Sequence, residues 1–109
     1  MVFALVDLGY YALLFNSWEI LVENAWFVYI VRCSDSTLYT GITTDLERRM
    51  DEHNSHKKGA RYTRTRRPVR LVYCEKVSSR SAAASREYAI KKMTLAEKCG
   101  LIENDKGDL

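Results

Sequence analysis

Two tyrosines, Tyr29 and Tyr39, lie in neighbouring segments rich in β-branched and aromatic residues, with the turn-forming Ser34, Asp35 and Ser36 between them. Side chains that face each other on adjacent strands approach within roughly 5 Å at Cβ. Two phenols at that separation can share a hydrogen bond, and a phenol beside a cation can accept a proton from water. The alternative interpretation of the pair is two packed aromatic side chains.

Three further side chains have the types that phosphodiester chemistry needs. Arg49 and His53 lie four residues apart in a segment with a helical pattern, so both are expected on one helix face. A guanidinium holds phosphate oxygens, and an imidazole transfers protons at neutral pH. Glu87 adds a carboxylate in a later helical segment, where the alternative is a solvated ion pair with Lys91 at i+4. Cleavage of a phosphodiester requires an activated water, a cation on the phosphate and stabilisation of the leaving oxygen.

The elements that must position these side chains begin with a hairpin. Residues 26–31 form a continuous β-branched and aromatic run, which is typical of a strand buried on both faces. Residues 37–43 are rich in Thr, Tyr and Ile and predict its antiparallel partner. Thr44 and Glu47 form a capping-box pattern, which predicts a helix that reaches about His53.

A loop is expected at residues 55–67, where no apolar periodicity is found. The pattern after it predicts a third strand at 69–73, a helix from residue 78 or 79 to 93, and a third helix at 94–102 that opens with a second capping box. The predicted fold class is therefore α+β, with a small three-stranded antiparallel sheet flanked by helices in the order β-β-α-β-α-α.

Charge is distributed unevenly along the chain. Residues 26–92 contain 15 Lys or Arg against 7 Asp or Glu, whereas residues 1–25 contain three acidic residues and no basic one. A basic field of this kind attracts polyanions, chiefly nucleic acid, and the alternative is a solvated basic face. Phosphate contacts and one stacking ring are expected from Lys57, Lys58, Arg61, Tyr62, Arg64, Arg66, Arg67, Arg86, Lys91 and Lys92.

Three segments resemble a known family in their order and spacing. Residues 27–33, 38–49 and 83–92 read FVYIVRC, LYTGITTDLERR and AASREYAIKK. They resemble the GIY-YIG nucleases, whose small standalone bacterial members typically carry Y-x-Y-I-x-R-C, L-Y-T-G-I-T-x-D-L-x-R-R and A-x-x-R-E-x-A-I-K-K. This chain has Phe-Val-Tyr in place of Gly-Ile-Tyr, has Tyr-Thr-Gly in place of Tyr-Ile-Gly, and lacks the usual glycine after Asp35.

The resemblance implies a role for each candidate catalytic residue. Tyr39 is the better candidate for the general base and Tyr29 orients it, although these two roles are exchangeable. Arg49 and His53 belong to the active site, and Glu87 is the ligand of a divalent metal, Mg²⁺ or Mn²⁺. A single carboxylate suits Mg²⁺, which keeps most of its hydration shell.

These observations predict a metal-dependent endonuclease that hydrolyses phosphodiester bonds in DNA, in repair, recombination or DNA processing. The alternative is a nucleic-acid-binding module that has the nuclease fold but cuts little or nothing without a partner. Glu87 favours the enzyme, because a binding module has no need of it. RNA as the substrate, and a protein partner that supplies specificity, remain open at this stage.

A chain of 109 residues is long enough for one domain. The predicted domain spans residues 25–102, between an extension of unknown role at 1–24, with a helix expected at 5–21, and a C-terminal tail at 103–109. The three cysteines form no C-x-x-C pair. No run reaches the ~18 apolar residues of a membrane span. A cytoplasmic protein without membrane contact is expected.

Overall fold

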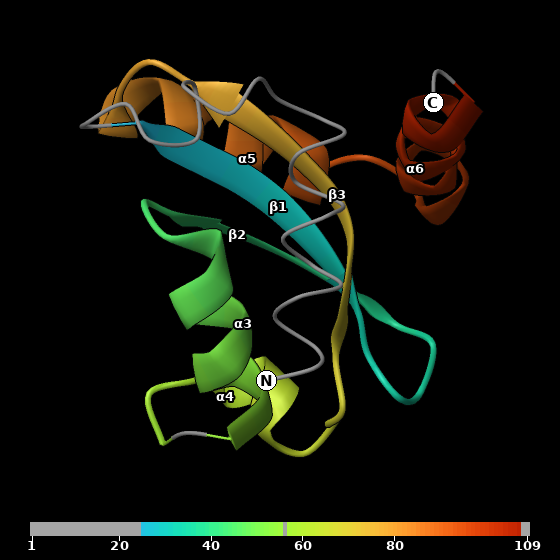
Figure 1. The fold of residues 1–109 in the computed structure, drawn as a ribbon. Coiled ribbons are helices and arrows are strands. Elements are labelled where there is room, and N and C mark those ends of the chain that lie inside the picture. Colours follow the sequence, from blue (N-terminus) through green and yellow to red (C-terminus); the bar gives the residue numbers. More distant parts are fainter. Residues whose placement is uncertain (1–24, 56, 108–109) are drawn as a thin grey trace.

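A computed structural model describes residues 25–55 and 57–107 of the chain. The helix expected at residues 5–21 lies outside this part. Within it, the central feature is a three-stranded antiparallel sheet in the order β2-β1-β3, formed by β1 (Trp26–Arg32), β2 (Leu38–Thr43) and β3 (Arg70–Val77) (Figure 1). The predicted fold class is confirmed.

β1 is the central strand because its apolar run supplies a core on both faces of the sheet. Phe27, Tyr29 and Val31 belong to one apolar cluster, whereas Val28 and Ile30 belong to the other. This alternation follows from the two-residue period of a strand. The prediction of a strand buried on both faces is confirmed.

The β1–β2 turn uses a serine where glycine is common. Ser36 has a φ of 69°, in the left-handed region that costs a residue with a Cβ roughly 1 kcal/mol. Asp35 stabilises the turn by accepting hydrogen bonds from the amide and the hydroxyl of Thr37 at 3.1 and 2.6 Å. It also pairs with Arg66 at 3.0 Å, which ties the turn to a distant segment.

The first helix of the described residues, α3 (Leu46–Ser55), begins one residue later than the capping box implied. The side chain of Asp45 accepts from the amide of Arg48 at 3.0 Å, and the Thr43 hydroxyl accepts from the amide of Asp45 at 3.1 Å. The expected cap by Thr44 is therefore wrong. Asp is as good an N-cap as Thr. With Asp45 as the cap, the helix begins at Leu46, whose side chain is buried in the core.

The predicted loop contains a short helix, α4 (Arg61–Arg64), which the sequence pattern did not indicate. β3 continues to Val77, beyond the predicted end at residue 73. Helix α5 (Arg80–Lys91) begins at Ser79, whose hydroxyl accepts from the amide of Ala82 at 3.0 Å. The start of this helix is confirmed.

The last helix, α6 (Leu95–Gly107), ends at Gly107 rather than near residue 102. Its predicted capping box is confirmed, because the amide of Thr94 donates to Glu97 at 2.9 Å and the amide of Glu97 donates to the Thr94 hydroxyl at 3.2 Å. No helix of the described part is long and apolar enough to cross a membrane.

The helices cover the two faces of the sheet separately. Leu46 and Met50 of α3 join the first apolar cluster, whereas Ala83 and Ile90 of α5 join the second (Figure 1). Asn54 fastens the end of α3 to the chain that leads into β3. Its amide donates to the carbonyl of Val69 at 3.0 Å and accepts from the Val69 amide at 2.6 Å, in the manner of a paired strand residue.

Candidate active site

A chain of buried hydrogen bonds joins strand β1 to helices α3 and α4. The hydroxyl of Tyr29 lies 2.7 Å from Nε2 of His53, and Nδ1 of the same ring lies 2.9 Å from the hydroxyl of Thr63. The Thr63 hydroxyl donates in turn to the carbonyl of Ala60 at 2.9 Å. Tyr29, His53 and Thr63 are each at most 1% exposed, so these bonds are shielded from water.

The direction of this chain is set by its last bond. A threonine hydroxyl has one proton, and in Thr63 that proton points to the carbonyl of Ala60. Thr63 therefore accepts from His53, which places the ring proton of His53 on Nδ1. Nε2 is then an acceptor, and the Tyr29 hydroxyl donates its proton to Nε2. The arrangement provides a base for the phenolic proton of Tyr29.

Burial keeps both partners neutral. Burial, together with the positive charge of Arg49, lowers the pKa of His53 to about 4. Burial also raises the pKa of Tyr29 to about 12, against the opposing influence of Arg49, which hydrogen-bonds its hydroxyl, while the charge of Glu87 adds to the rise. At neutral pH the pair is therefore an uncharged phenol and an uncharged imidazole.

The Tyr29 hydroxyl lies beneath β2, at a residue that has no side chain. Tyr29 pairs with Gly41 across the sheet, and a Cβ built on Gly41 would stand 2.5 Å from the hydroxyl oxygen and 2.7 Å from Cζ. Any other residue would displace the hydroxyl or the strand. Gly41 thus lets Tyr29 reach His53 under the edge of the sheet.

Arg49 is held beside Tyr29 by two other bonds. Its Nη1 donates to Glu52 at 2.8 Å and to the carbonyl of Lys58 at 2.9 Å. The Arg49 side chain is about one quarter exposed, at 23%. It therefore has a defined position and an open side, which suits a group that binds a phosphate oxygen. Arg48, by contrast, points outward, with only a 3.9 Å contact to Glu52.

Tyr39 takes a different position from Tyr29. Its ring meets His53 edge to face, with the centroids 5.6 Å apart, and it stacks on Tyr62 at 5.9 Å. Tyr62 is 37% exposed and lies under the guanidinium of Arg66, at 3.8 Å. The two tyrosines of the hairpin thus share His53 as a neighbour, but a hydrogen bond to the ring is recorded only for Tyr29.

Glu87 enters the same region from α5. Its charge acts on the Tyr29 hydroxyl, and its i+4 partner Lys91 lies 3.4 Å from its carboxylate and 5.8 Å from the centre of the Tyr39 ring. The ion pair with Lys91 is therefore present. Glu87 is 24% exposed, so its carboxylate is open to water as well. The structure brings all five candidate residues together at the β2 edge.

The donor set fits a weakly anchored divalent cation. Residues 25–55 and 57–107 hold no group of three or more His, Cys, Asp or Glu side chains that could cage a metal. One hydrated carboxylate beside an arginine is instead the kind of site that Mg²⁺ occupies with water and substrate oxygens as its other ligands. Glu87 is the residue that would hold it.

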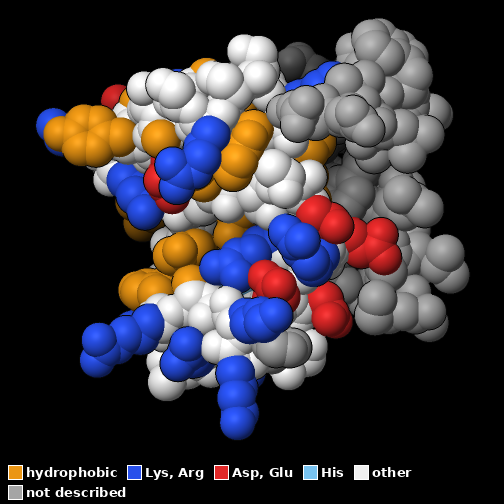
Figure 2. Space-filling model, turned by 90° about the vertical axis from the view of Figure 1, so that its left-hand side faces the viewer, with side chains coloured by type: hydrophobic (Ala, Val, Ile, Leu, Met, Phe, Trp, Pro, Cys, Tyr) orange, Lys and Arg blue, Asp and Glu red, His pale blue; other side chains and the backbone are white. Residues whose placement is uncertain are grey.

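The predicted nucleic-acid-binding residues divide into two groups. Several make bonds within the protein: Arg64 to the carbonyl of Gly59, Arg66 to Asp35, Arg67 to the carbonyl of His53 and Arg86 to Glu75. Lys and Arg side chains nonetheless project over the lower part of the molecule, where α3 and α4 lie, and over the upper part near α5, with hydrophobic side chains between them (Figure 2).

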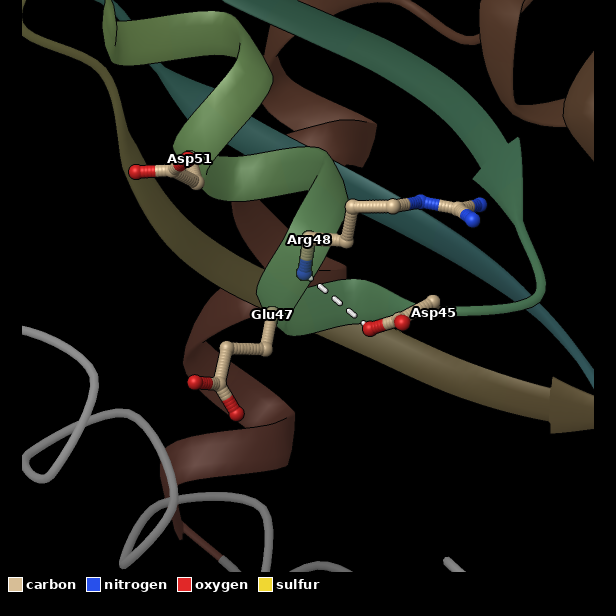
Figure 3. A pocket seen from close by; sticks show the side chains of 4 residues that line it. All are labelled: Asp45, Glu47, Arg48 and Asp51. Atoms are coloured by element: carbon tan, nitrogen blue, oxygen red, sulfur yellow. Dashed lines mark hydrogen bonds between the residues drawn. The ribbon is translucent and has the colours of Figure 1, made fainter.

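The outer side of α3 has the opposite character. A shallow pocket of about 260 Å³ is lined by Asp45, Glu47, Arg48 and Asp51 (Figure 3). The carboxylates of Glu47 and Asp51 point away from Arg48, and the only bond drawn between the lining residues is the helix cap (Figure 3). Three carboxylates and one guanidinium line this pocket, so this side of α3 repels phosphates.

Thr63 is the site residue that the sequence interpretation missed. It lies in the segment taken for a loop, and its hydroxyl matters only because α4 turns it toward His53. The one available signal was a threonine set between basic residues in a stretch that is otherwise exposed.

We expect Thr63→Val to leave the His53 Nδ1–H group without an acceptor, which typically costs about 1–3 kcal/mol and frees the ring tautomer.

The measurement is the pair of imidazole ¹⁵N shifts of His53, which report the tautomer. Thr63→Ser, which keeps the hydroxyl, should retain the wild-type shifts. If Thr63→Val retained them too, the hydroxyl would not determine the tautomer.

Acid should destabilise the fold through His53 before the carboxylates titrate. The pKa of this ring falls from 6.5 in the unfolded chain to about 4 in the folded one. Between these values the unfolded chain binds one more proton, so stability is complete above about pH 6.5 and falls as the pH is lowered toward 4. The loss should approach roughly 3 kcal/mol.

Urea unfolding at pH 7.0, 6.0 and 5.0 measures this loss. In His53→Gln the side chain does not titrate, and its unfolding free energy should be nearly constant over the same range. Equal pH dependence of both proteins would exclude His53 as the source.

Comparison with known proteins identifies the arrangement. The sequence profile of the GIY-YIG catalytic domain matches residues 25–99, and the chain belongs to the GIY-YIG family. Among its relatives, the UPF0213 protein DP2720 of Desulfotalea psychrophila is 61% identical over 84 residues, which cover 76% of each chain. A UPF0213 protein of Syntrophus aciditrophicus is 56% identical over 79 residues, 72% of this chain and 91% of that one.

A solved structure agrees with the fold. The solution NMR structure of the protein EF2693 from E. faecalis is 40% identical and covers 75% of this chain and 86% of its own, with a TM-score of 0.53. The resemblance to the small standalone members of the family is confirmed.

Proposed function

We propose that this protein is a metal-dependent endonuclease that hydrolyses phosphodiester bonds in DNA. The observation that carries the proposal is the hydrogen bond from Tyr29 to a buried, neutral His53, beside the open side of Arg49. Two packed aromatic side chains would have no need of an oriented imidazole at the hydroxyl. Its role in repair, recombination or DNA processing, and its place in the cytoplasm, belong to the same proposal.

The chemistry begins at Tyr29. A water molecule that attacks the phosphorus loses a proton to the Tyr29 oxygen as Tyr29 passes its own proton to Nε2 of His53. The P–O bond to the leaving oxygen breaks, and that oxygen takes up a proton from solvent. Thr63 holds the imidazole in the tautomer that accepts, and Arg49 stabilises the negative charge that develops on Tyr29 and on the phosphate. Of the two exchangeable tyrosine roles, this assigns the base to Tyr29 and leaves Tyr39 to position His53 and Tyr62.

Glu87 would hold the divalent metal, which when bound neutralises charge on the scissile phosphate and stabilises the leaving oxygen. Without a cation the carboxylate opposes the approach of a phosphate. Lys91 offsets part of that repulsion through its 3.4 Å contact. The affinity for substrate near Glu87 should therefore increase when the metal is bound, and the affinity for metal should increase when the substrate is bound.

The second candidate function is a nucleic-acid-binding module, which the projecting basic side chains of α4 and α5 favour. Both functions predict salt-dependent and sequence-tolerant binding, because the contacts act on phosphates. They differ in cleavage. A nicking assay on supercoiled plasmid with Mg²⁺, with Mn²⁺ and with EDTA tests the proposal, with a single-stranded RNA tested in parallel.

We expect nicked plasmid with Mg²⁺ or Mn²⁺ and intact plasmid with EDTA. Binding without nicking in either metal would contradict the enzyme and leave the binding module. Cleavage of the RNA alone would move the substrate from DNA to RNA.

A further inference from the structure

Two arginines outside the active site face each other without a counter-charge. Arg32, at the end of β1, pairs directly with Arg70 of β3 in the antiparallel register. Like charges in this position repel and destabilise a sheet. In the described portion of the chain, neither arginine makes a salt bridge. Arg32 is the penultimate residue of the family-like segment 27–33, and the cleavage chemistry gives it no role.

The two side chains line one cleft. It has a volume of about 370 Å³, and Cys33, Pro68 and Val69 complete its wall, so none of the described residues that line it carries a carboxylate. Nε of Arg32 is shielded from water and has no hydrogen-bond partner among the residues described. A buried donor without an acceptor is unfavourable, and native proteins rarely keep one unless a ligand or water supplies the acceptor.

Several other arginines of the basic segment differ in this respect. Arg64, Arg66 and Arg67 each donate to an acceptor of the protein itself. An anion with more than one acceptor oxygen would satisfy Nε of Arg32 and contact Arg70 as well, because two guanidinium groups present several donors each. A phosphate group meets this requirement, since its oxygens match the guanidinium geometry and its charge offsets the repulsion.

We propose that the cleft between Arg32 and Arg70 binds a backbone phosphate of the nucleic acid at a distance from the cleaved bond. Arg32 follows Tyr29 by three residues, about 10 Å along β1, and this odd spacing directs its side chain to the other face of the sheet. The inference rests on the proposed function for the identity of its ligand.

Binding to a 20-base-pair duplex in EDTA, measured across salt concentrations, tests this cleft. Arg70→Gln and Arg32→Gln should each weaken binding about tenfold at low salt and reduce the slope of log affinity against log salt by about 1. The matched control is Arg48→Gln, which removes the same charge from an exposed side chain in the acidic pocket of α3. The control should keep the wild-type slope.

The cleavage rate at saturating enzyme separates this inference from the proposed function. Arg70→Gln should keep the wild-type rate once the substrate is bound, because Arg70 does not touch the reacting phosphate. If the wild-type protein binds the duplex but never cuts it, the proposed function fails and the altered slope of Arg70→Gln still supports the cleft. If both variants keep the wild-type slope, the cleft is not a phosphate site, whatever the cleavage assay shows.

NMR titration distinguishes the two sources of phosphate. The Nε–H signal of Arg32 should shift on addition of the duplex and shift less with an equal concentration of inorganic phosphate. A shift with inorganic phosphate and none with the duplex would assign the cleft to a free anion and overturn the proposal, as would no shift with either.

Discussion

Tyr29→Phe should reduce the single-turnover cleavage rate by about 10²–10⁴-fold while leaving DNA affinity near the wild-type value, because general base catalysis typically contributes that factor. The substitution keeps the ring under Gly41 and removes only the oxygen that is bonded to His53. It also leaves the buried Nε2 without a donor, so some loss of stability, about 1–3 kcal/mol, is expected and should be measured separately by urea unfolding.

Tyr39→Phe is the matched control. It removes the same atom from the other tyrosine of the hairpin but retains the edge contact with His53 and the stacking on Tyr62. Its rate should fall far less. The opposite order, with Tyr39→Phe the slower enzyme, would return the role of base to Tyr39, and equal wild-type rates in both variants would exclude a tyrosine base.

Glu87→Gln should abolish metal-dependent cleavage, with a loss on the order of a hundredfold or more, and should leave DNA affinity unchanged or slightly raised. Glutamine keeps the shape and removes the charge. The cation is then held poorly, and the repulsion between carboxylate and phosphate disappears. Nicking rates over a series of Mg²⁺ concentrations, beside duplex affinity in EDTA, separate these two effects.

Two further variants test whether this result is specific to Glu87. Glu47→Gln makes the same change on the outer side of α3, and it should cut like the wild-type protein. Arg49→Ala should weaken binding and cleavage together, because its charge attracts the phosphate in the ground state and in the transition state. If Glu87→Gln cuts as fast as its parent in Mg²⁺, then Glu87 is a surface helix residue and the mechanism fails.

The parts of the fold that could be predicted are those that depend on local pattern. The run at residues 26–31 indicates a central strand, because only a strand covered on both sides buries consecutive residues such as 27–31. The four-residue spacing of Arg49 and His53 indicates a shared helix face, whatever the rest of the fold does. The second capping box is equally local, since both its bonds lie within four residues.

The parts that could not be predicted depend on contacts between distant residues. The hydroxyl of Thr63 acquires a role only when α4 packs against α3, and no periodicity announces a four-residue helix. The same limit applies to Arg66, which looked free to bind phosphate in the sequence but pairs with Asp35, 31 residues away. The residues next to Thr63 and Arg66 in the sequence do not indicate that their partners are His53 and Asp35.

The position of the site on β2 has a consequence for the solution behaviour of the protein. β2 is an edge strand, and in the described structure no further strand pairs with its outer side. Exposed edges invite pairing with other chains, and proteins commonly cover them. Here a further strand on that side would cover the β2 edge, beside which the candidate site residues lie. The edge is short, at six residues, which limits the surface that it offers to another chain.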